Sequence, residues 1–243
     1  MKIISVWNRK GGTGKTTTAG NMAAYLADHG RVLIVDTDPQ GNLSGWLCKN
    51  PTVELADVLS GTVKLSEAIY KVSGNLDIVP TFAIGGDLNQ FAETRLPSLP
   101  FAFADFADQV DALGFDYLVY DMGPGDGILQ RSILSTADEV LLVATPEYFA
   151  ADGIASAVAI LEEIKKTRRA TFTVKKLVAN RINNSYSAHE VYLESFQGLE
   201  WQLYQIGQNT RIHDAVMFHG LIKEWDPGNK FAPVYQELAG GLA

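Results

Sequence analysis

The chain of 243 residues has little cysteine and no long apolar run. Its single cysteine, Cys48, excludes a disulfide framework within one chain and a metal site built from several cysteines. The absence of any run of 18 or more apolar residues argues against a membrane-spanning helix. The N-terminus enters the apolar segment 2–7 at once, without the charged region or cleavage site of a signal peptide. We therefore expect a cytoplasmic protein in a reducing environment.

Acidic residues outnumber basic ones, and the excess lies in one part of the chain. The formal net charge is −8, which alone argues against an acidic partner such as DNA. Residues 1–152 hold 10 Lys and Arg against 19 Asp and Glu, whereas residues 153–243 hold 10 against 9. We therefore expect any surface for nucleic acid to lie in the C-terminal third.

Short apolar runs alternate with helical patterns, which is typical of βαβ units and a mostly parallel central sheet with helices on both faces. No repeat, low-complexity tract or linker interrupts this pattern, so we expect a single α/β domain over residues 1–243. Strands are predicted at 2–7, 31–36, 75–80, 115–121, 139–145 and 172–181. Helices are predicted at 15–29, 102–113, 152–169, 187–197, 211–218 and 230–242, with short surface helices at 53–59 and 65–70.

The segment NRKGGTGKTTTAGN (8–21) follows the first predicted strand and opens the first helix, which is the context that a phosphate-binding loop requires. Its glycines let backbone N–H groups approach phosphate oxygens at a helix N-terminus. We expect Lys15 to pair with the β- and γ-phosphates and the Thr16 hydroxyl to bind Mg²⁺. The alternative, a glycine-rich turn without a nucleotide, is disfavoured by Gly-Lys-Thr directly after a strand. The residues expected to bind the nucleotide here are Gly11, Gly12, Thr13, Gly14, Lys15, Thr16 and Thr17.

Two further segments place carboxylates at strand ends. Asp121 ends the strand 115–121, where a Walker B aspartate holds Mg²⁺ through water. Taken alone, an aspartate at a strand end is more often a helix cap or a turn residue. Asp36 and Asp38 lie in DTDPQGN (36–42), a loop that can change conformation with the γ-phosphate. One of them can orient the attacking water while the other supports the Mg²⁺ shell or the loop, and the alternative is a plain turn.

In this order the motifs resemble the ParA/MinD group of ATPases with a deviant Walker A motif, and the ParA/Soj branch best. The resemblance spans nearly the whole chain, and it implies a P-loop NTPase fold, ATP and Mg²⁺ as ligands, and a slow ATP hydrolysis that a partner stimulates. The motifs that carry it are KGGTGKTT (10–17), VDTDPQGN (35–42), YLVYD (117–121), ATPEYFAADG (144–153), NTRIHDA (209–215) and the segment 219–239.

The resemblance also implies roles for single residues. Lys10 matches the signature lysine of the family, which reaches across an ATP-dependent homodimer to the partner's phosphates, as an arginine finger does in trans. A solvent-exposed lysine without a role is the alternative. Asp38 matches the aspartate of hydrolysis, and Asn180 resembles the asparagine that reads adenine. The expected catalytic residues are therefore Lys10, Lys15 and Asp38, and the expected metal residues are Thr16, Asp36 and Asp121.

Two segments depart from the family pattern. After Asp121 the family commonly has two prolines and a serine, whereas this chain has MGPGD (122–126). Gly207 and Gln208 stand where Pro-Arg is common. The first departure concerns the second switch and the second concerns the adenine pocket, and neither removes a phosphate or Mg²⁺ contact.

Other members of the group bind membranes, iron–sulfur clusters or operator DNA. Membrane-bound relatives end in a basic amphipathic helix, whereas no basic residue follows Lys230 here, so we expect no membrane partner. Iron–sulfur relatives need cysteine ligands that Cys48 does not supply. Relatives that bind an operator carry an extra domain before the phosphate loop, so we expect no N-terminal helix-turn-helix domain.

The short ParA/Soj proteins bind DNA nonspecifically as ATP dimers, and this chain has candidates for that role. Arg211 matches a basic position that the family uses against the phosphate backbone, and Lys223 and Lys230 lie further along. The run of cations in 165–169 is denser but also suits a helix C-terminus, so it is left open between the two.

The resemblance predicts partition of a plasmid or chromosome on the nucleoid, with a ParB-like adaptor or another cargo protein as partner. A positioning factor for a protein assembly and an ATP-gated regulatory switch are the alternatives.

Overall fold

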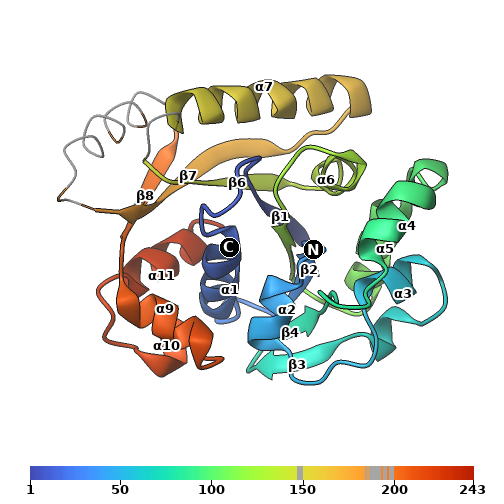
Figure 1. Cartoon of the computed structure of the whole chain (residues 1–243), viewed down its shortest axis with the longest axis horizontal. Coiled ribbons are helices and arrows are strands. Elements are labelled where there is room, and N and C mark those ends of the chain that lie inside the picture. The colour runs from blue at the N-terminus through green and yellow to red at the C-terminus, as the bar shows by residue number, and fades with distance from the viewer. Residues whose placement is uncertain (147–149, 184, 186–192, 194–195, 197–199) are drawn as a thin grey trace.

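The computed structural model describes residues 1–146, 150–183, 185, 193, 196 and 200–243. At its centre is an eight-stranded sheet with helices on both faces (Figure 1). Neighbouring strands are parallel except β3 and β4, which form an antiparallel edge. In sheet order the strands are β3 (Tyr70–Ser73), β4 (Leu76–Val79), β2 (Val32–Thr37), β5 (Tyr117–Met122), β1 (Lys2–Trp7), β6 (Glu139–Ala144), β7 (Thr173–Ile182) and β8 (Gln202–Gly207).

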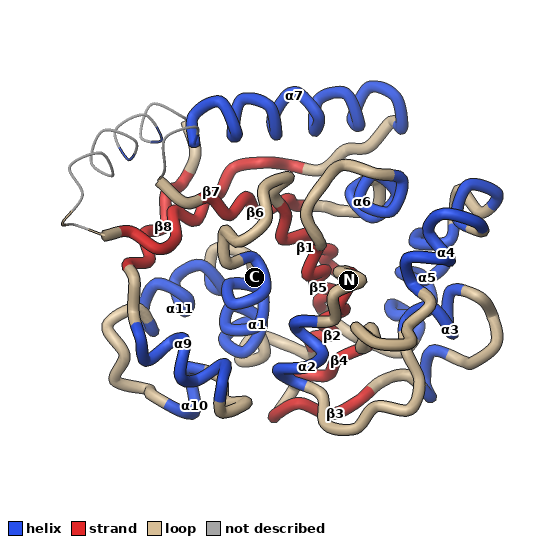
Figure 2. Tube along the Cα trace, in the orientation of Figure 1, coloured by secondary structure: helices blue, strands red, loops and turns tan. Residues whose placement is uncertain are grey.

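Each face of the sheet has its own helices (Figure 2). One face carries α3 (Leu55–Leu59), α4 (Leu88–Thr94), α5 (Ala102–Ala112), α6 (Ile128–Leu134) and α7 (Ala150–Arg168), with short 3-10 turns at Leu65–Glu67 and Leu96–Ser98. The other carries α1 (Lys15–Leu26), α2 (Asn42–Leu47), α9 (Thr210–Met217), α10 (Ile222–Trp225) and α11 (Ala232–Gly240). No helix within the described ranges is both long and apolar enough to cross a membrane.

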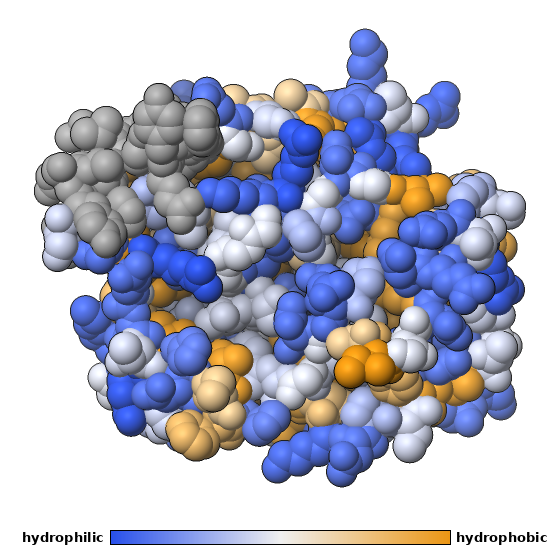
Figure 3. Space-filling view, viewed as in Figure 1, coloured by the Kyte–Doolittle hydropathy of each residue, from blue (hydrophilic) through white to orange (hydrophobic). Residues whose placement is uncertain are grey.

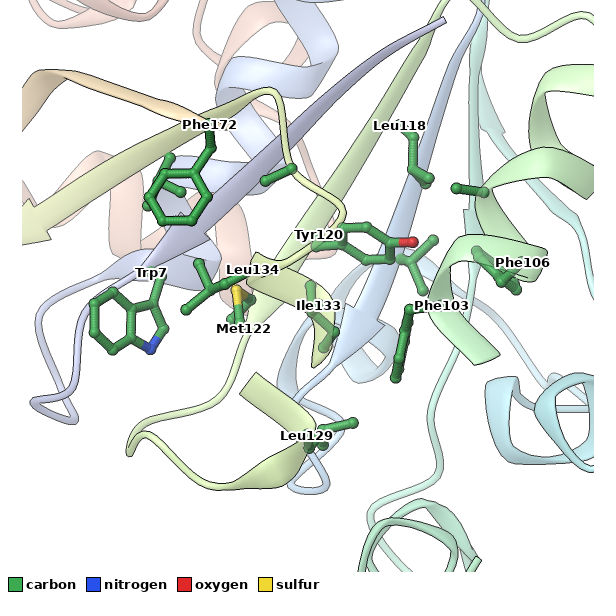
Figure 4. Packing of buried hydrophobic residues seen from close by; sticks show 14 of the residues in the cluster. Trp7, Phe103, Phe106, Leu118, Tyr120, Met122, Leu129, Ile133, Leu134 and Phe172 are labelled. Atoms are coloured by element: carbon green, nitrogen blue, oxygen red, sulfur yellow. The ribbon is translucent and has the colours of Figure 1, made fainter. Parts of the chain in front are cut away.

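The strands alternate their side chains between two cores. In β2, Leu33 and Val35 join the core under α3–α7, whereas Val32 and Ile34 join the core under α1 and α11. All four are fully buried, as expected for a central parallel strand. Figure 4 shows the first core around Tyr120 of β5, whose ring centroid lies 6.0 Å from that of Phe103. This packing fixes the position at which each strand ends.

The order β2-β5-β1 brings three loops together at one edge of the sheet. β5 lies between β1 and β2 and is parallel to both, so the carboxyl ends of the three strands point the same way. The segments that follow them are 8–14, 38–41 and 123–127. Ligands of parallel α/β sheets bind at this kind of edge.

The predicted fold class is confirmed in its architecture: the structure is an α/β domain with a mostly parallel central sheet and helices on both faces. The six predicted strands are present within a residue or two of their predicted bounds. The first helix ends at Leu26 rather than at 29, and the segment 65–70 contains a 3-10 turn before β3. The segment 53–59 forms α3 but is not a surface helix, because its apolar residues are buried. The helix predicted at 187–197 falls outside the described residues apart from 193 and 196.

Two strands and four helices were not predicted: β3, β8, α2, α4, α6 and α10. The strands are the two edges of the sheet, where one side of each strand is open and the apolar pattern is weak. The helices have four to seven residues, which is too short for a helical period to stand out.

Candidate active site

The glycine-rich loop joins β1 to α1 and turns at two left-handed positions. Gly12 and Gly14 have φ of 74° and 90°, values that other residues rarely adopt. Gly14 is also the N-cap of α1, and a Cβ there would lie 1.9 Å from the amide nitrogen of Asn180. The sequence therefore needs glycine at 14 for two independent reasons, backbone conformation and close approach.

Lys15 is the first residue of α1 and is buried inside the loop. Its Nζ donates a hydrogen bond to the Lys10 carbonyl at 3.1 Å. Burial lowers the pKa of the Lys15 amine, while the nearby carboxylates of Asp121 and Asp38 raise it. The predicted phosphate lysine and two of the predicted acidic residues therefore lie in one electrostatic site.

Asp121 and Asp36 lie side by side on neighbouring strands, because β5 and β2 pair with these two residues in register. Both oxygens of Asp121 are buried, and neither has a hydrogen-bond partner among the described residues. Burial raises the pKa of Asp121 well above its ordinary value, and the charge of Asp36 adds to this effect. The Thr16 hydroxyl, which approaches Asp121 without meeting hydrogen-bond geometry, and the positive charge of Lys15 lower this pKa. A buried carboxylate without a partner is costly unless a cation accompanies it.

Asp36 has the opposite environment, because each of its oxygens accepts hydrogen bonds. One oxygen accepts from the Ser44 backbone N–H at 2.8 Å and from its hydroxyl at 2.7 Å, and the other accepts from the Asp38 N–H at 3.2 Å. Burial raises the pKa of Asp36 to about 7, although the Ser44 bonds lower it. Of the two supporting roles predicted for this pair, the loop-supporting role matches what Asp36 contacts.

Ser44 was missed by the sequence analysis. Besides bonding to Asp36, its hydroxyl oxygen accepts a hydrogen bond from the Thr81 backbone N–H at 2.8 Å, and the Thr81 hydroxyl donates to the Asp36 carbonyl at 2.7 Å. Thr81 follows β4, so three segments meet at this carboxylate. The signal available in the sequence was a serine in the first turn of α2, three residues beyond Gly41.

Asp38 faces the second switch. The Gln40 N–H donates to Asp38 Oδ1 at 3.0 Å, and this bond closes a turn within the loop 38–41 that follows β2. A Cβ on Gly123 would lie 3.2 Å from Asp38 Cγ, so the glycine allows the two loops to approach. This is the first place where the chain departs from its family pattern. Asp38 and Gly123 both line a cavity of 560 Å³ between the two loops, α4 and α6.

The second switch is hydrogen-bonded to the glycine-rich loop. The Gly125 N–H donates to the Arg9 carbonyl at 2.9 Å, and the Trp7 indole N–H donates to the Gly125 carbonyl at 3.0 Å. Gly125 has φ of 95°, a conformation that favours glycine. The backbone therefore explains the glycine at this position of MGPGD (122–126). The fully buried Trp7 thus connects the end of β1 with the segment that follows β5.

A second cavity of 360 Å³ opens beside the glycine-rich loop. Asn180 lies between loop and cavity: its Nδ2 donates to the Thr13 carbonyl at 2.9 Å, and its Oδ1 accepts from the Arg181 N–H at 2.9 Å. The register of β7 is irregular here, and Arg181 has φ of 57°. Such an irregularity redirects a side chain, and it aims Asn180 at the loop. The cavity is lined by Gly14, Thr17, Asn180, Arg181, Ile206, Gly207, Gln208, Asn209, Thr210, Ile212, His213 and Val216.

Gly207 belongs to the second segment that departs from the family pattern, and it lines this cavity. Packing explains why glycine occupies this position. A Cβ at 207 would lie 2.8 Å from the Phe231 ring. Phe231 precedes α11, so the C-terminal helix occupies space that a side chain at 207 would need.

The three predicted DNA-binding residues are exposed or half-buried, and the structure does not bring them into one unpaired cluster. Arg211 lies 3.3 Å from Asp226, and its guanidinium lies 4.3 Å from the centre of the Trp225 ring. Lys223 pairs with Asp28 at 2.5 Å. Lys230 lies over the Phe231 ring at 4.9 Å.

The cations of 165–169 lie at the end of α7, on the opposite face of the sheet from α9–α11 (Figure 1). One of them, Lys165, pairs with Glu162 at 2.9 Å. The two groups of cations therefore cannot form one surface within a single chain.

Comparison with known proteins agrees with this site. Residues 1–174 match the family model described as an AAA domain. The chromosome-partitioning ATPase Soj of Thermus thermophilus is 31% identical over 98% of this chain and 94% of its own length. The chain belongs to the ParA/Soj-type partition ATPases. Soj of Bacillus subtilis, a sporulation initiation inhibitor protein, is 30% identical over 100% of this chain and 98% of its own.

Solved structures show the same fold. McdA of Cyanothece, solved without nucleotide, has a TM-score of 0.87 at 20% identity and covers 100% of this chain and 99% of its own. The septum site-determining protein MinD of Pyrococcus horikoshii, solved with Mg-ADP, has a TM-score of 0.82 at 24% identity and covers 99% of this chain and 95% of its own. At these identities the likeness concerns the fold.

Proposed function

We propose that this ParA/Soj-type protein hydrolyses ATP, dimerises on ATP, binds DNA nonspecifically and distributes a plasmid or chromosome with a ParB-like adaptor. The observation that carries the nucleotide part is the pair of unpartnered, buried Asp121 oxygens beside Lys15 and Thr16. This arrangement fits Mg²⁺ bound with a nucleotide. The Mg-ADP of the MinD structure supports the same reading by likeness of fold.

In this proposal the loop residues and Asn180 hold the ATP. The N–H groups of 11–17 face the phosphates at the N-terminus of α1, and Lys15 pairs with the β- and γ-phosphates. The buried Thr13 hydroxyl, which has no partner among the described residues, is a further polar group beside the loop. The base enters the 360 Å³ cavity, which Asn180 borders.

Thr16 and Asp121 hold the Mg²⁺, whose charge offsets that of the phosphates. Asp36 supports this site through its hydrogen bonds with Ser44, which hold the loop 38–41 in place. Asp38 orients the attacking water, because it lies near Lys15 and beside Gly123 of the second switch.

Lys10 acts across the dimer. It is exposed at the entrance of the loop, where a second subunit can reach it, and its carbonyl anchors Lys15 of the same chain. A cation supplied in trans stabilises charge that develops on the phosphates during transfer.

DNA binding rests on Arg211, Lys223 and Lys230, and dimerisation doubles their number on one assembly. Two observations favour alternative functions. The likeness to MinD supports a positioning factor for a protein assembly. The similarity to Soj of Bacillus subtilis, a sporulation initiation inhibitor, supports an ATP-gated regulatory switch.

Two measurements on the wild-type chain test the proposal. Light scattering with ATP and Mg²⁺, with ADP, or without nucleotide should show a dimer only with ATP. Anisotropy of unrelated DNA duplexes should then show much tighter binding in the ATP sample than in the other two. A dimer that binds no DNA at low salt would contradict the proposed DNA binding and favour the ATP-gated regulatory switch. Capture of partners with an ATP-trapped form would identify the cargo.

A further inference from the structure

Arg211 has an internal partner that any DNA phosphate must replace. The guanidinium extends from α9 and its side chain is 55% exposed. Its Nε lies 3.3 Å from Asp226 Oδ2, and its Cζ lies 4.3 Å from the Trp225 ring centre. Asp226 is 23% exposed, so both charges reach solvent.

An ion pair of this exposure is weak, contributing about 1.5- to 5-fold to an equilibrium constant. A phosphate can therefore displace Asp226, but only by giving up that factor. The pair acts as competition and leaves Arg211 able to bind an anion.

Asp226 Oδ2 is also connected to the 360 Å³ cavity beside the glycine-rich loop, which the proposal assigns to the nucleoside and which is called the nucleoside cavity below. Asp226 Oδ2 also accepts from Asn229 Nδ2 at 3.1 Å, and that nitrogen lies 3.5 Å from Asn209 Oδ1. Asn209 is the N-cap of α9, and its Oδ1 accepts from the Ile212 N–H at 3.2 Å. Asn229 is buried, whereas Asp226 and Asn209 are half-buried, so these contacts are partly shielded from solvent.

Helix α9 is at once a wall of the cavity and the carrier of Arg211. Asn209, Ile212 and His213 line the cavity, whereas Arg211 extends toward α10. A nucleoside that shifts the start of α9 changes the contacts of Asn209 and of Arg211 together, because Arg211 contacts Asp226 directly and Asn209 is connected to it through Asn229 Nδ2.

We propose that Asp226 gates Arg211: it competes with DNA phosphate for the guanidinium, and the nucleoside cavity biases this competition through Asn209 and Asn229. The gate rests on the proposed DNA binding and adds its regulation. An effector shifts such an equilibrium only by its differential affinity for the two arrangements, so the expected effect is modest.

The test compares Asp226→Asn with Glu224→Gln in the full chain. Glu224 lies on α10 and contacts Ser73, so its substitution removes the same charge without touching Arg211. Without nucleotide, Asp226→Asn should raise the affinity for an unrelated duplex by about 2- to 5-fold over wild type and over Glu224→Gln. The ratio of affinities with and without ATP should fall by the same factor. In an Arg211→Ala background the gain should vanish. Equal effects of the two substitutions, or a gain that survives in that background, would overturn the gate.

A second measurement does not depend on DNA. The Arg211 Nε–H signal in a ¹⁵N spectrum, assigned by its loss in Arg211→Lys, should exchange faster with water in Asp226→Asn and when ATP is added to wild type. A signal that ignores ATP overturns the coupling to the cavity. If this signal responds to ATP but wild type holds no DNA in any state, the coupling of the Arg211–Asp226 pair to the cavity stands, whereas the proposed DNA binding and the competition with DNA phosphate fail.

Discussion

Charged side chains are buried at the edge of the sheet after β1, β2 and β5, called the nucleotide edge below, whereas they are partly exposed and paired on the surface over α9–α11. At the nucleotide edge, Asp121 and Lys15 are buried, and Asp121 has no hydrogen-bond partner among the described residues. Over α9–α11, Arg211 and Lys223 are partly exposed, and each pairs with a carboxylate of its own chain. Figure 3 shows that this second surface also carries apolar residues among the hydrophilic ones. Phe218 is 71% exposed there.

The difference decides how much each region says about ligands. A buried, unpartnered carboxylate raises the free energy of the folded chain, so a cation that joins it is expected on physical grounds. An exposed pair costs little and contributes little, so it is compatible with a ligand and also with none. The proposed nucleotide site is therefore supported by its energetics, whereas the proposed DNA surface is supported only by the positions of its residues.

The largest expected effect is on Lys10. Lys10→Ala should keep ATP affinity through Lys15 and the loop N–H groups, yet lower hydrolysis by about 10³-fold or more, as loss of a cation in trans does. Phosphate release and light scattering with ATP and Mg²⁺ measure hydrolysis and dimerisation.

Arg9→Ala is the matched control for Lys10. Arg9 is the neighbouring exposed cation, and it contacts Ser156 and Asp126 of its own chain. A Lys10→Ala protein that dimerises and hydrolyses ATP as Arg9→Ala does would remove Lys10 from the mechanism.

Asp38→Ala should lower single-turnover hydrolysis by about 10²- to 10⁴-fold, the usual contribution of a group that positions a proton transfer. ATP should stay bound in a long-lived dimer, because the phosphate-binding groups remain. Gln40→Ala is the control, since Gln40 is exposed and only its backbone contacts Asp38. Unchanged hydrolysis in Asp38→Ala would leave Asp36 as the candidate.

Asp121→Asn sharpens the comparison through stability. Removing a buried charge without a partner should raise the free energy of unfolding by about 1–3 kcal/mol in urea with EDTA, and Mg²⁺-dependent hydrolysis should be lost. Asp36→Asn should have the opposite sign, because the Ser44 and Asp38 bonds need both carboxylate oxygens. Destabilisation by both substitutions would show that Asp121 is satisfied in solution.

The smallest effect concerns Arg211. Arg211→Glu should weaken binding of all duplexes alike and reduce the slope of log K against log salt by about 0.9 for each lost phosphate contact. Hydrolysis without DNA should be unchanged. Lys165→Glu, on the opposite face at the end of α7, is the control. An equal loss from both would move the DNA surface away from α9.

The sequence predicted which segments meet at the edge after β1, β2 and β5, because the signals for these segments are local. The loop 8–14, the strand ends at Asp36 and Asp121, and the helix after Lys15 are each readable within a few residues. Parallel strands then bring their carboxyl ends together, so nearness follows from the fold class. What could not be read was that Asp36 is satisfied and Asp121 is not, since this depends on Ser44 and Thr81.

The C-terminal surface was predicted less well because its contacts are distant in sequence. Lys223 pairs with Asp28, 195 residues away, and no local pattern indicates that pair. Arg211 lies on α9 and Asp226 follows α10, 15 residues further along the chain. Charge counts showed that the C-terminal third is less acidic than the rest of the chain, but they could not show that Arg211 and Lys223 pair with Asp226 and Asp28. The roles assigned to these residues stay predictions.

Two of the four tryptophans donate their indole N–H to a glycine carbonyl, one in each region. Trp7 bonds to Gly125 in the second switch, and Trp46 bonds to Gly220 between α9 and α10, both at 3.0 Å. Both side chains are buried, so their emission reports on these bonds with little contribution from solvent. Variants that keep Trp7 or Trp46 as the single one of the four tryptophans would give each region its own intrinsic fluorophore. The order in which nucleotide affects the second switch and the C-terminal helices could then be timed without an added label.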